Sequence, residues 1–294
     1  MFKIGCHVSA AGGVYNAPKN AAALECETFQ ISTRPPMGGP APKISEADAD
    51  KFKDEMGKYG YTDFVVHAPY IVNFGSAKKP TFHGSISIVS EELKRANMLG
   101  AKFVMTHLGS LKDLGQDKGM KQSSQGLKEV LEKYEAAVKN PTTEFLLEIS
   151  AGAGEVIVDT FEELAELMEL LKKHKTFGGI CFDTQHAFSA GYDLRDAKSV
   201  TETFKRFDKI IGLKWLKMSH INDSKVEFGG RKDRHEHIDD GKIGQKGFLA
   251  MMEFWQKNLK TKYFPLILET EHDKVESDLN ILKKLRNKSS HLQK

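Results

Sequence analysis

Residues 103–107 read FVMTH, and residues 145–148 read FLLE. Each stretch is a short apolar run, typical of a buried β-strand, that ends abruptly in a histidine or an acidic residue. Residues 179–183, GICFD, repeat the pattern. Because strands that are buried on both faces read as continuous apolar runs, these stretches predict a parallel sheet covered by helices.

Eight such runs alternate with segments of helical spacing. Helices are expected to begin at Thr160 and Ser199, with Glu163 and Glu202 in the capping-box position, and one is expected to end at Gly100. Eight units in 294 residues predict an α/β fold, a TIM-type (β/α)8 barrel with its active site at the C-terminal strand ends. A doubly wound open sheet is the alternative, but no GxGxxG motif follows an early strand. The expected strands are residues 2–8, 28–32, 64–66, 103–106, 145–147, 179–182, 213–219 and 264–268.

Composition indicates an ordinary soluble protein. A hydrophobic fraction of 40% provides a large core and gives no sign of disorder, so residues 1–294 are expected to form one domain with a polar tail at about 286–294. A net charge of +3 is too small to establish nucleic-acid binding. The chain has neither a signal peptide nor an apolar run that could span a membrane. Three cysteines without a CxxC motif predict no disulfide framework and fit a reducing cytoplasm.

Six strands in turn end in a residue type that binds metals. These positions are 35 to 49 residues apart in the sequence, but in a barrel they converge on one rim. A single strand-end histidine is usually structural, and salt bridges to Lys or Arg are the alternative for the acidic members; the joint pattern is what favours metal binding. The six residues are His67, His107, Glu148, Asp183, His220 and Glu269.

Three more candidates lie in loops beyond that rim: His186, Asp233 and His235, the last two within the long irregular segment 221–245. Nine such groups exceed the four ligands of one tetrahedral zinc and predict a cluster of two or three metals with a bridging carboxylate. Of the remaining histidines, His7 is expected to line the barrel mouth, His174 and His291 to be surface residues, and His83, His237 and His272 are left open.

Longer stretches around these residues resemble the endonuclease IV family of abasic-site endonucleases. They occur in the family's order over nearly the whole chain. The most specific is HINDSKVEFGGRKDRHEHIDDGKIG at residues 220–244, because it fixes the spacing of His220, Asp233 and His235. The others are GCHVSAAGG (5–13), HAPYIVNFGS (67–76), THLGS (106–110), LEISAGAG (147–154), FDTQHAFSAGYDL (182–194) and LILET (266–270).

The resemblance implies an enzyme that nicks duplex DNA on the 5′ side of an abasic site and leaves a 3′-hydroxyl, with some trimming of 3′ ends. It also implies Glu148 and Glu269 as catalytic residues that orient the nucleophile. We further expect a monomer without a nucleotide cofactor. The resemblance also implies three zinc ions: His67 and His107 on the first, Asp183, His220 and Glu269 on the second, Glu148 bridging these two, and His186, Asp233 and His235 on the third.

Tyr70 and Ile71 match the family positions whose side chains wedge into the duplex, although ordinary loop packing is the alternative. Basic residues around the rim are expected to pair with phosphates, and each of them has a solvated surface charge as its alternative. These residues are Arg34, Lys225, Arg231, Lys232 and Arg234.

The chain departs from the family pattern at two places. Residues 32–43, STRPPMGGPAPK, carry prolines and Met37 where the family has a polar, arginine-bearing loop, so the shape imposed on DNA is expected to differ. Ile149 stands where the family commonly has Asn, so a hydrogen bond behind the metal ligands is expected to be lost or replaced, with a modest effect on their orientation.

The sequence leaves two other functions open. A metal-dependent sugar isomerase or epimerase of the xylose isomerase type would share the barrel and several ligands. It would have no use for a third metal centre built from His186 and the DRH block at residues 233–235. The other alternative is an inactive barrel retained as a DNA-binding scaffold, against which the intact set of nine ligands argues.

Overall fold

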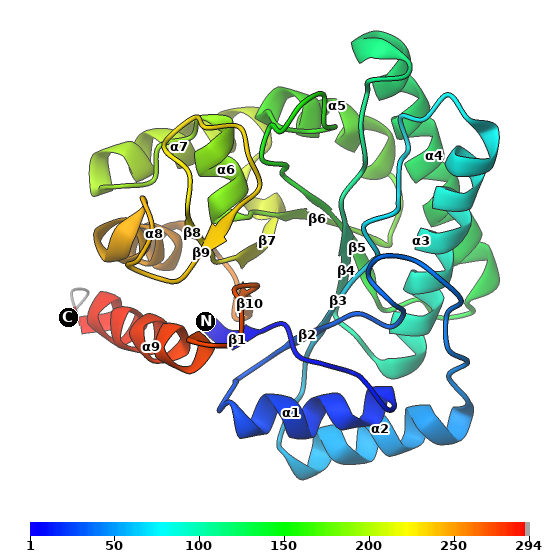
Figure 1. Cartoon of the computed structure of the whole chain (residues 1–294), viewed down its shortest axis with the longest axis horizontal. Coiled ribbons are helices and arrows are strands. Elements are labelled where there is room, and N and C mark those ends of the chain that lie inside the picture. Colours follow the sequence, from blue (N-terminus) through cyan, green and yellow to red (C-terminus); the bar gives the residue numbers. More distant parts are fainter. Residues whose placement is uncertain (292–294) are drawn as a thin grey trace.

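Eight parallel strands form one sheet at the centre of the molecule, and helices surround it in the computed structural model, which describes residues 1–291 (Figure 1). Around the sheet the strands follow the order β1, β10, β7, β6, β5, β4, β3, β2. They are β1 (Phe2–Cys6), β2 (Gln30–Ile31), β3 (Val65–His67), β4 (Phe103–Thr106), β5 (Glu144–Glu148), β6 (Phe177–Cys181), β7 (Leu216–His220) and β10 (Phe264–Leu268).

The sheet nearly closes on itself where β1 meets β2. A parallel bridge joins His7 to Gln30, and the N–H of Val8 donates to the Gln30 carbonyl at 2.8 Å. The predicted TIM (β/α)8 barrel is therefore confirmed. The helices are η1 (Val14–Asn16), α1 (Ala17–Ala23), α2 (Glu46–Lys58), α3 (Lys79–Leu99), α4 (Gly115–Ala137), α5 (Phe161–Leu171), α6 (Thr184–Ala190), α7 (Ala197–Ile210), η2 (Leu213–Trp215), α8 (Gly244–Asn258) and α9 (Val275–His291).

Two of the three expected helix ends are correct. The Thr160 side chain caps α5 by accepting from the Glu163 N–H, and α3 ends at Gly100 in the left-handed conformation, with φ of 85°. The expected start at Ser199 is wrong. Helix α7 begins at Ala197, because the Asp196 carboxylate accepts two backbone N–H groups of the first turn, including that of Ser199, at 2.9 Å.

Strand boundaries differ from the prediction mainly before β7. Residues 213–215 form the helical turn η2 instead of the first part of a strand, because Gly212 turns the chain at φ of 97° and Asp208 accepts the Leu213 N–H at 2.8 Å. The long segment after β7 is less irregular than expected. It contains a two-stranded hairpin of β8 (Asp223–Ser224) and β9 (His235–Glu236), which Figure 1 shows beside α6.

Apolar side chains form two layers. The larger layer fills the space between the strands and the surrounding helices. The smaller layer fills the barrel interior, because alternate residues of each strand point inward. Its members are Val65, Phe103, Met105, Leu146, Cys181, Met218 and Ile267.

The C-terminal helix α9 lies beside β1, so the first strand and the last helix lie on the same side of the barrel (Figure 1). Residues 286–291 of the expected polar tail continue this helix, and residues 292–294 lie outside the described part, as does the side chain of His291. Over residues 1–291, no helix is both long enough and apolar enough to cross a membrane.

A buried ion pair anchors the loop after β2 to α3. Glu92 has no exposed surface, and its carboxylate accepts from the Thr33 hydroxyl at 2.6 Å and from Nε of Arg34 at 2.5 Å. Arg95 donates to the Thr33 carbonyl at 2.5 Å. The loop that carries the proline-rich segment is therefore fixed to the barrel by charge pairing.

Replacing Glu92 by Ala should lower the free energy of unfolding by about 3–5 kcal/mol, because the buried Arg34 charge would lose its buried partner and keep only the half-exposed Glu91. Chemical denaturation measures this change. Glu91→Ala is the matched control: its carboxylate also lies 3.0 Å from Arg34, but the side chain is half exposed, so the expected loss is about 0–1 kcal/mol. Equal losses in the two variants would contradict the account.

Candidate metal centre

Each of the six strand-end candidates stands two residues beyond an apolar residue of the barrel interior. Side chains two residues apart on a strand point to the same side, so the apolar residue fills the barrel and the candidate lies above it at the mouth. The interior residue and its candidate are Val65 and His67, Met105 and His107, Leu146 and Glu148, Cys181 and Asp183, Met218 and His220, Ile267 and Glu269.

Glu148 lies at the centre of the group. Its side chain is 1% exposed. One carboxylate oxygen lies 2.7 Å from Nδ1 of His220 and 3.6 Å from Nδ1 of His186, and the other lies 3.3 Å from Nε2 of His67. His107 belongs to the same group, since its ring nitrogen lies within 4.8 Å of ligand atoms of His67 and Glu148. A carboxylate in this place can bridge two cations.

Asp183 connects the strand-end residues to the loop residues. Its carboxylate lies 3.9 Å from Nδ1 of His220 and 3.7 Å from Nε2 of His235. Asp233 lies 3.3 Å from Nε2 of His186 and 3.4 Å from Nε2 of His235. The hairpin therefore brings its two predicted ligands to the strand ends.

Glu269 completes the set, with its carboxylate 3.3 Å from Nδ1 of His220. All nine predicted residues thus lie in one cluster. Within residues 1–291, no lysine or arginine nitrogen lies within 4.0 Å of the four carboxylates. The alternative of salt bridges to basic residues is therefore excluded for Glu148, Asp183 and Glu269.

Four buried atoms of the cluster lack a hydrogen-bond partner among the described residues: Nε2 of His67, His186 and His235, and one oxygen of Glu148. Such orphaned groups are costly unless something else binds them. Zinc bonds of about 2.0–2.1 Å in a tetrahedron place ligand atoms roughly 3.3 Å apart. The separations of His67 from Glu148, and of Asp233 from His186 and His235, are 3.3–3.4 Å, so the residues fit metal ions.

The cluster favours positive charge. Burial alone would raise the pKa of the Glu148 carboxyl, but the imidazoles of His220 and His107 hold this pKa well below its usual value. Burial opposes the charge on His186, yet Asp183 and Asp233 raise its pKa to about 10. Burial lowers the pKa of His107 to about 4. In the absence of a cation, a proton on His186 balances part of the carboxylate charge, and a bound cation would displace that proton.

The free nitrogen of each imidazole is set by the partner of the other nitrogen. Nδ1 of His67 donates to the Ala68 carbonyl at 2.6 Å, and Nδ1 of His186 donates to the Ile149 carbonyl at 2.9 Å, so Nε2 of each is directed into the cluster. The Ile149 position thus orients His186 through its backbone, which does not depend on the side chain.

Gln30 and Asn222 support the cluster and were not predicted. Gln30 accepts from Nε2 of His220 at 2.8 Å and donates to Glu269 at 2.6 Å. Asn222 donates to Asp183 at 2.9 Å and accepts the N–H of Glu269 at 2.8 Å. The available signal was a polar residue inside an apolar run for Gln30, and a position two residues after His220 for Asn222.

The remaining histidines lie outside the cluster. His7 lies at the mouth, as expected, and its Nδ1 is 3.1 Å from the Gln30 amide. His237 is buried and pairs with Asp278 of α9 at 2.7 Å, while His83 and His272 are exposed. The expectation for His174 is corrected: this residue is half-buried and pairs with Glu135 at 3.2 Å, so it is not a free surface residue.

An exposed apolar rim borders the cluster. We define it as Met37, Tyr70 and Ile71, which are 80%, 50% and 44% exposed. The Tyr70 N–H donates to the Pro36 carbonyl at 2.9 Å, and Ile71 lies against Gly38, so the loops after β2 and β3 form one surface. The Tyr70 ring also stacks on His107, with centroids 4.7 Å apart.

The predicted phosphate contacts divide into two groups. Lys225, Lys232 and Arg234 are exposed in the segment that carries the hairpin. Arg231 donates to Asp159 at 2.5 Å, and Arg34 is buried against Glu92, so both already have an acidic partner. The burial of Arg34 was not visible in the sequence, because Glu92 is far along the chain.

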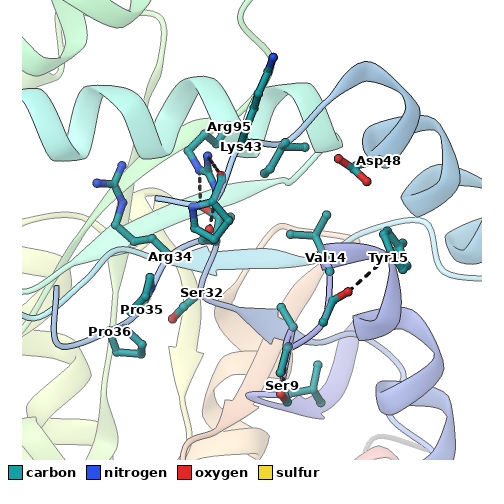
Figure 2. A pocket seen from close by; sticks show the side chains of 18 of the residues that line it. Ser9, Val14, Tyr15, Ser32, Arg34, Pro35, Pro36, Lys43, Asp48 and Arg95 are labelled. Atoms are coloured by element: carbon teal, nitrogen blue, oxygen red, sulfur yellow. Dashed lines mark hydrogen bonds between the residues drawn. The ribbon is translucent and has the colours of Figure 1, made fainter. Parts of the chain in front are cut away.

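A cleft of about 700 Å³ adjoins the cluster between the loops after β1 and β2 (Figure 2). His7 lines it, but none of the nine clustered residues does. Figure 2 shows Pro35 and Pro36 on one side of the cleft, and Val14 and Tyr15 on the other. The cleft therefore widens the barrel mouth toward the proline-rich loop.

Relatives of known name match this chain over almost its full length. A probable endonuclease 4 of Nitrosopumilus maritimus is 37% identical over 97% of this chain and 99% of that protein. A probable endonuclease 4 of Halothermothrix orenii is 36% identical over 91% of this chain and 93% of that protein. The chain belongs to the endonuclease 4 (endonuclease IV) family. The family resemblance inferred from the sequence motifs is confirmed.

Fold comparisons agree with this membership. Residues 18–287 match the family model described as a xylose isomerase-like TIM barrel. Among solved structures, endonuclease IV from Thermus thermophilus is 28% identical, with a TM-score of 0.82 over 97% of this chain and 99% of that chain. A D-tagatose 3-epimerase-like protein is 19% identical, with a TM-score of 0.77 over 99% of this chain and 100% of that chain. At this identity the similarity shows the fold alone.

In this member of the endonuclease IV family, Gln30→Leu should weaken the binding of a divalent metal, tested with zinc, by roughly 10–100-fold, because His220 and Glu269 lose the group that orients them. Competition with a chelator measures the affinity. Gln125→Leu, on the exposed face of α4, is the matched control and should leave the affinity unchanged. Unaltered zinc affinity in a folded Gln30→Leu variant would argue against the orienting role.

Proposed function

We propose that this protein is a zinc-dependent DNA-repair endonuclease that hydrolyses the phosphodiester on the 5′ side of an abasic site and leaves a 3′-hydroxyl. Trimming of damaged 3′ ends is a second expected activity of the same centre. The observation that carries the proposal is the convergence of nine histidine and acidic residues, four of whose buried atoms have no hydrogen-bond partner in the described chain. Membership of the endonuclease IV family supports the substrate.

We propose three zinc ions per chain, in the grouping that the family resemblance implies. Bound zinc would act as a Lewis acid there, lowering the pKa of water and neutralising phosphate charge. The close groups His67–His107–Glu148 and Glu148–Asp183–His220–Glu269 have Glu148 in common, which supports the proposal that its carboxylate would be shared by two of the ions. The loop residues His186 and His235 meet Asp183 in a further group and lie next to Asp233.

The two catalytic residues of the proposal are Glu148 and Glu269. Both face the centre of the mouth, and neighbouring imidazoles, foremost that of His220, offset the burial that would raise the pKa of Glu269 and hold it at about 2. Ionised carboxylates accept hydrogen bonds from an attacking water and thereby fix its direction toward phosphorus. Cations bound beside these carboxylates would also reduce their repulsion of a negatively charged nucleophile.

In the proposed function, the apolar rim accounts for the selectivity for abasic sites. An abasic nucleotide has no base to unstack, so turning it out of the helix costs little. Met37, Tyr70 and Ile71 present exposed apolar side chains next to the metal centre, suited to fill the gap in the base stack. Met37 gives this wedge a more apolar character than the arginine-bearing loop of the family pattern.

A sugar isomerase is the competing function, and the position of the hairpin argues against it. Asp233 and His235 reach His186 and Asp183 at 3.3–3.7 Å, which builds a third ligand group. Metal analysis discriminates the two: about three zinc ions per chain favours the nuclease, and one or two exchangeable manganese ions favours the isomerase.

The proposal extends to the state of the protein in the cell. We expect a monomer of one domain, residues 1–294, acting in the cytoplasm on duplex DNA without a nucleotide cofactor. The three cysteines of the chain are free thiols, as suits a reducing compartment.

The purified protein should nick a duplex that carries one synthetic abasic site, and prolonged chelation should abolish this activity. Glu148→Gln should reduce incision by about a hundredfold or more, because the bridging carboxylate is lost, while gel-shift assays should still detect DNA binding. Glu166→Gln, an exposed residue of α5, should incise normally. Absence of nicking by zinc-replete wild-type protein would favour the inactive scaffold.

Removing one phosphate contact should weaken binding about equally on all sequences and reduce the slope of log affinity against log salt by about 1. Lys225→Ala should behave this way, because the residue is exposed on the segment that carries the hairpin. Lys260→Ala is the control, since it precedes β10 at the opposite end of the barrel. Binding titrations at several salt concentrations measure both, and equal slopes for the two variants would exclude Lys225 from the DNA contact.

A further inference from the structure

Two buried cysteines are in contact where the barrel closes. Cys6 ends β1, and Cys26 lies between α1 and β2. Their Sγ atoms are 3.6 Å apart, and the residues are 1% and 7% exposed. Both are free thiols. Neither takes part in the metal centre or in the proposed hydrolysis.

The backbone holds these thiols together. The N–H of Glu27 donates to the Ile4 carbonyl at 2.8 Å, and the Glu27 carboxylate accepts the Ile4 N–H at 3.0 Å. A Cβ on Gly5 would lie 1.7 Å from the Thr28 carbonyl oxygen, so the two segments approach as closely as glycine permits. The sulfur atoms therefore stay in contact in the folded protein.

We propose that Cys6 and Cys26 are a modification site, a dithiol that a hydroperoxide oxidises to an intramolecular disulfide across the closure of the barrel. A disulfide needs its sulfur atoms about 2.05 Å apart. From 3.6 Å this requires the sulfur atoms to approach by about 1.5 Å, a movement on the scale of side-chain rotation.

Cys26 is the thiol that reacts first. The hydrogen bond between the two thiols lowers the pKa of Cys26 against the opposing effect of burial. The charge of Lys283 lowers this pKa further, and the Glu27 carboxylate opposes it. Lys283 is held there by its donation to the Glu25 carbonyl at 2.8 Å. Cys26 is also the more exposed of the pair, which gives a small oxidant access to its sulfur.

The reaction balances with hydrogen peroxide as the oxidant. The Cys26 thiolate attacks one peroxide oxygen, the O–O bond breaks, and a sulfenic acid and hydroxide form. The Cys6 sulfur then attacks the Cys26 sulfur, the S–O bond breaks, and the departing hydroxyl leaves as water with the Cys6 proton. Two thiols are oxidised by two electrons, and one peroxide is reduced to two waters.

The disulfide would strengthen a weak part of the sheet. Few backbone contacts join the β1 and β2 segments: the bond from Glu27 to Ile4, the bridge between His7 and Gln30, and the adjacent bond from Val8. A crosslink there restrains the unfolded chain, so the oxidised protein should have a midpoint of thermal unfolding roughly 5 °C higher. Gln30 belongs to this closure and also orients His220 and Glu269.

The test treats the zinc-loaded protein with a small excess of hydrogen peroxide, blocks remaining thiols under denaturing conditions, and measures intact mass and linked peptides. The expected result is a loss of about 2 Da, a fall from three free thiols to one, and a peptide that links residues 6 and 26. Dithiothreitol should restore three thiols. Cys181, which is buried inside the barrel, should remain free.

Three retained thiols, oxygen added to a single cysteine, or a disulfide between two chains would each overturn the proposal. Cys26→Ser and Cys26→Ala are the control variants, and each should keep two free thiols and gain no thermal stability under peroxide. Equal stabilisation of wild type and controls would also contradict it. If the variants do not fold, the linked peptide from the wild-type protein still decides the outcome.

Discussion

The attraction between buried carboxylates and positive charge is the interaction on which this structure depends. Glu148 and Asp183 have almost no exposed surface, and moving an ionised carboxylate out of water costs several kcal/mol. In the described chain, no lysine or arginine offsets that cost. With neutral imidazoles, the four carboxylates give the cluster a charge that only cations or bound protons balance.

The barrel makes this arrangement possible because its strands run in parallel and their side chains alternate. An apolar residue such as Leu146 closes the interior, and two residues later Glu148 points into the mouth. The packed layer below excludes water from one side, so the field of each carboxylate acts on its neighbours with little screening. The hairpin then adds Asp233 and His235 to the strand-end residues, so the cluster is enclosed on the side of the hairpin as well.

The sequence predicted most of the barrel and all nine members of the cluster, because both depend on local features. An apolar run followed by His107 or Glu148 is visible within five residues, and the order of the runs specifies the barrel. The third ligand group also depended on the family spacing of Asp233 and His235. The helix ends predicted from the sequence were less reliable. Asp196 competes with Ser199 as the cap of α7, and only the three-dimensional structure decides between them.

Features that depend on distant partners were not predictable. Arg34 is buried because Glu92, 58 residues along the chain, accepts from it, and one sequence gives no sign of that pairing. Gln30 orients His220 across 190 residues. The cysteine count excluded a disulfide framework but did not reveal that Cys6 and Cys26 meet where the barrel closes. Long-range pairing of polar groups thus separates the predicted from the unpredicted part of the site.

A crystal structure with diffraction data collected on both sides of the zinc absorption edge tests the central claim most directly. The account predicts three anomalous peaks at the barrel mouth, one of them bounded by His67 and His107, one by His220 and Glu269, and one by Asp233 and His235. Glu148 should lie between the first two. No peak within bonding distance of these side chains, in crystals grown from zinc-replete protein, would contradict it.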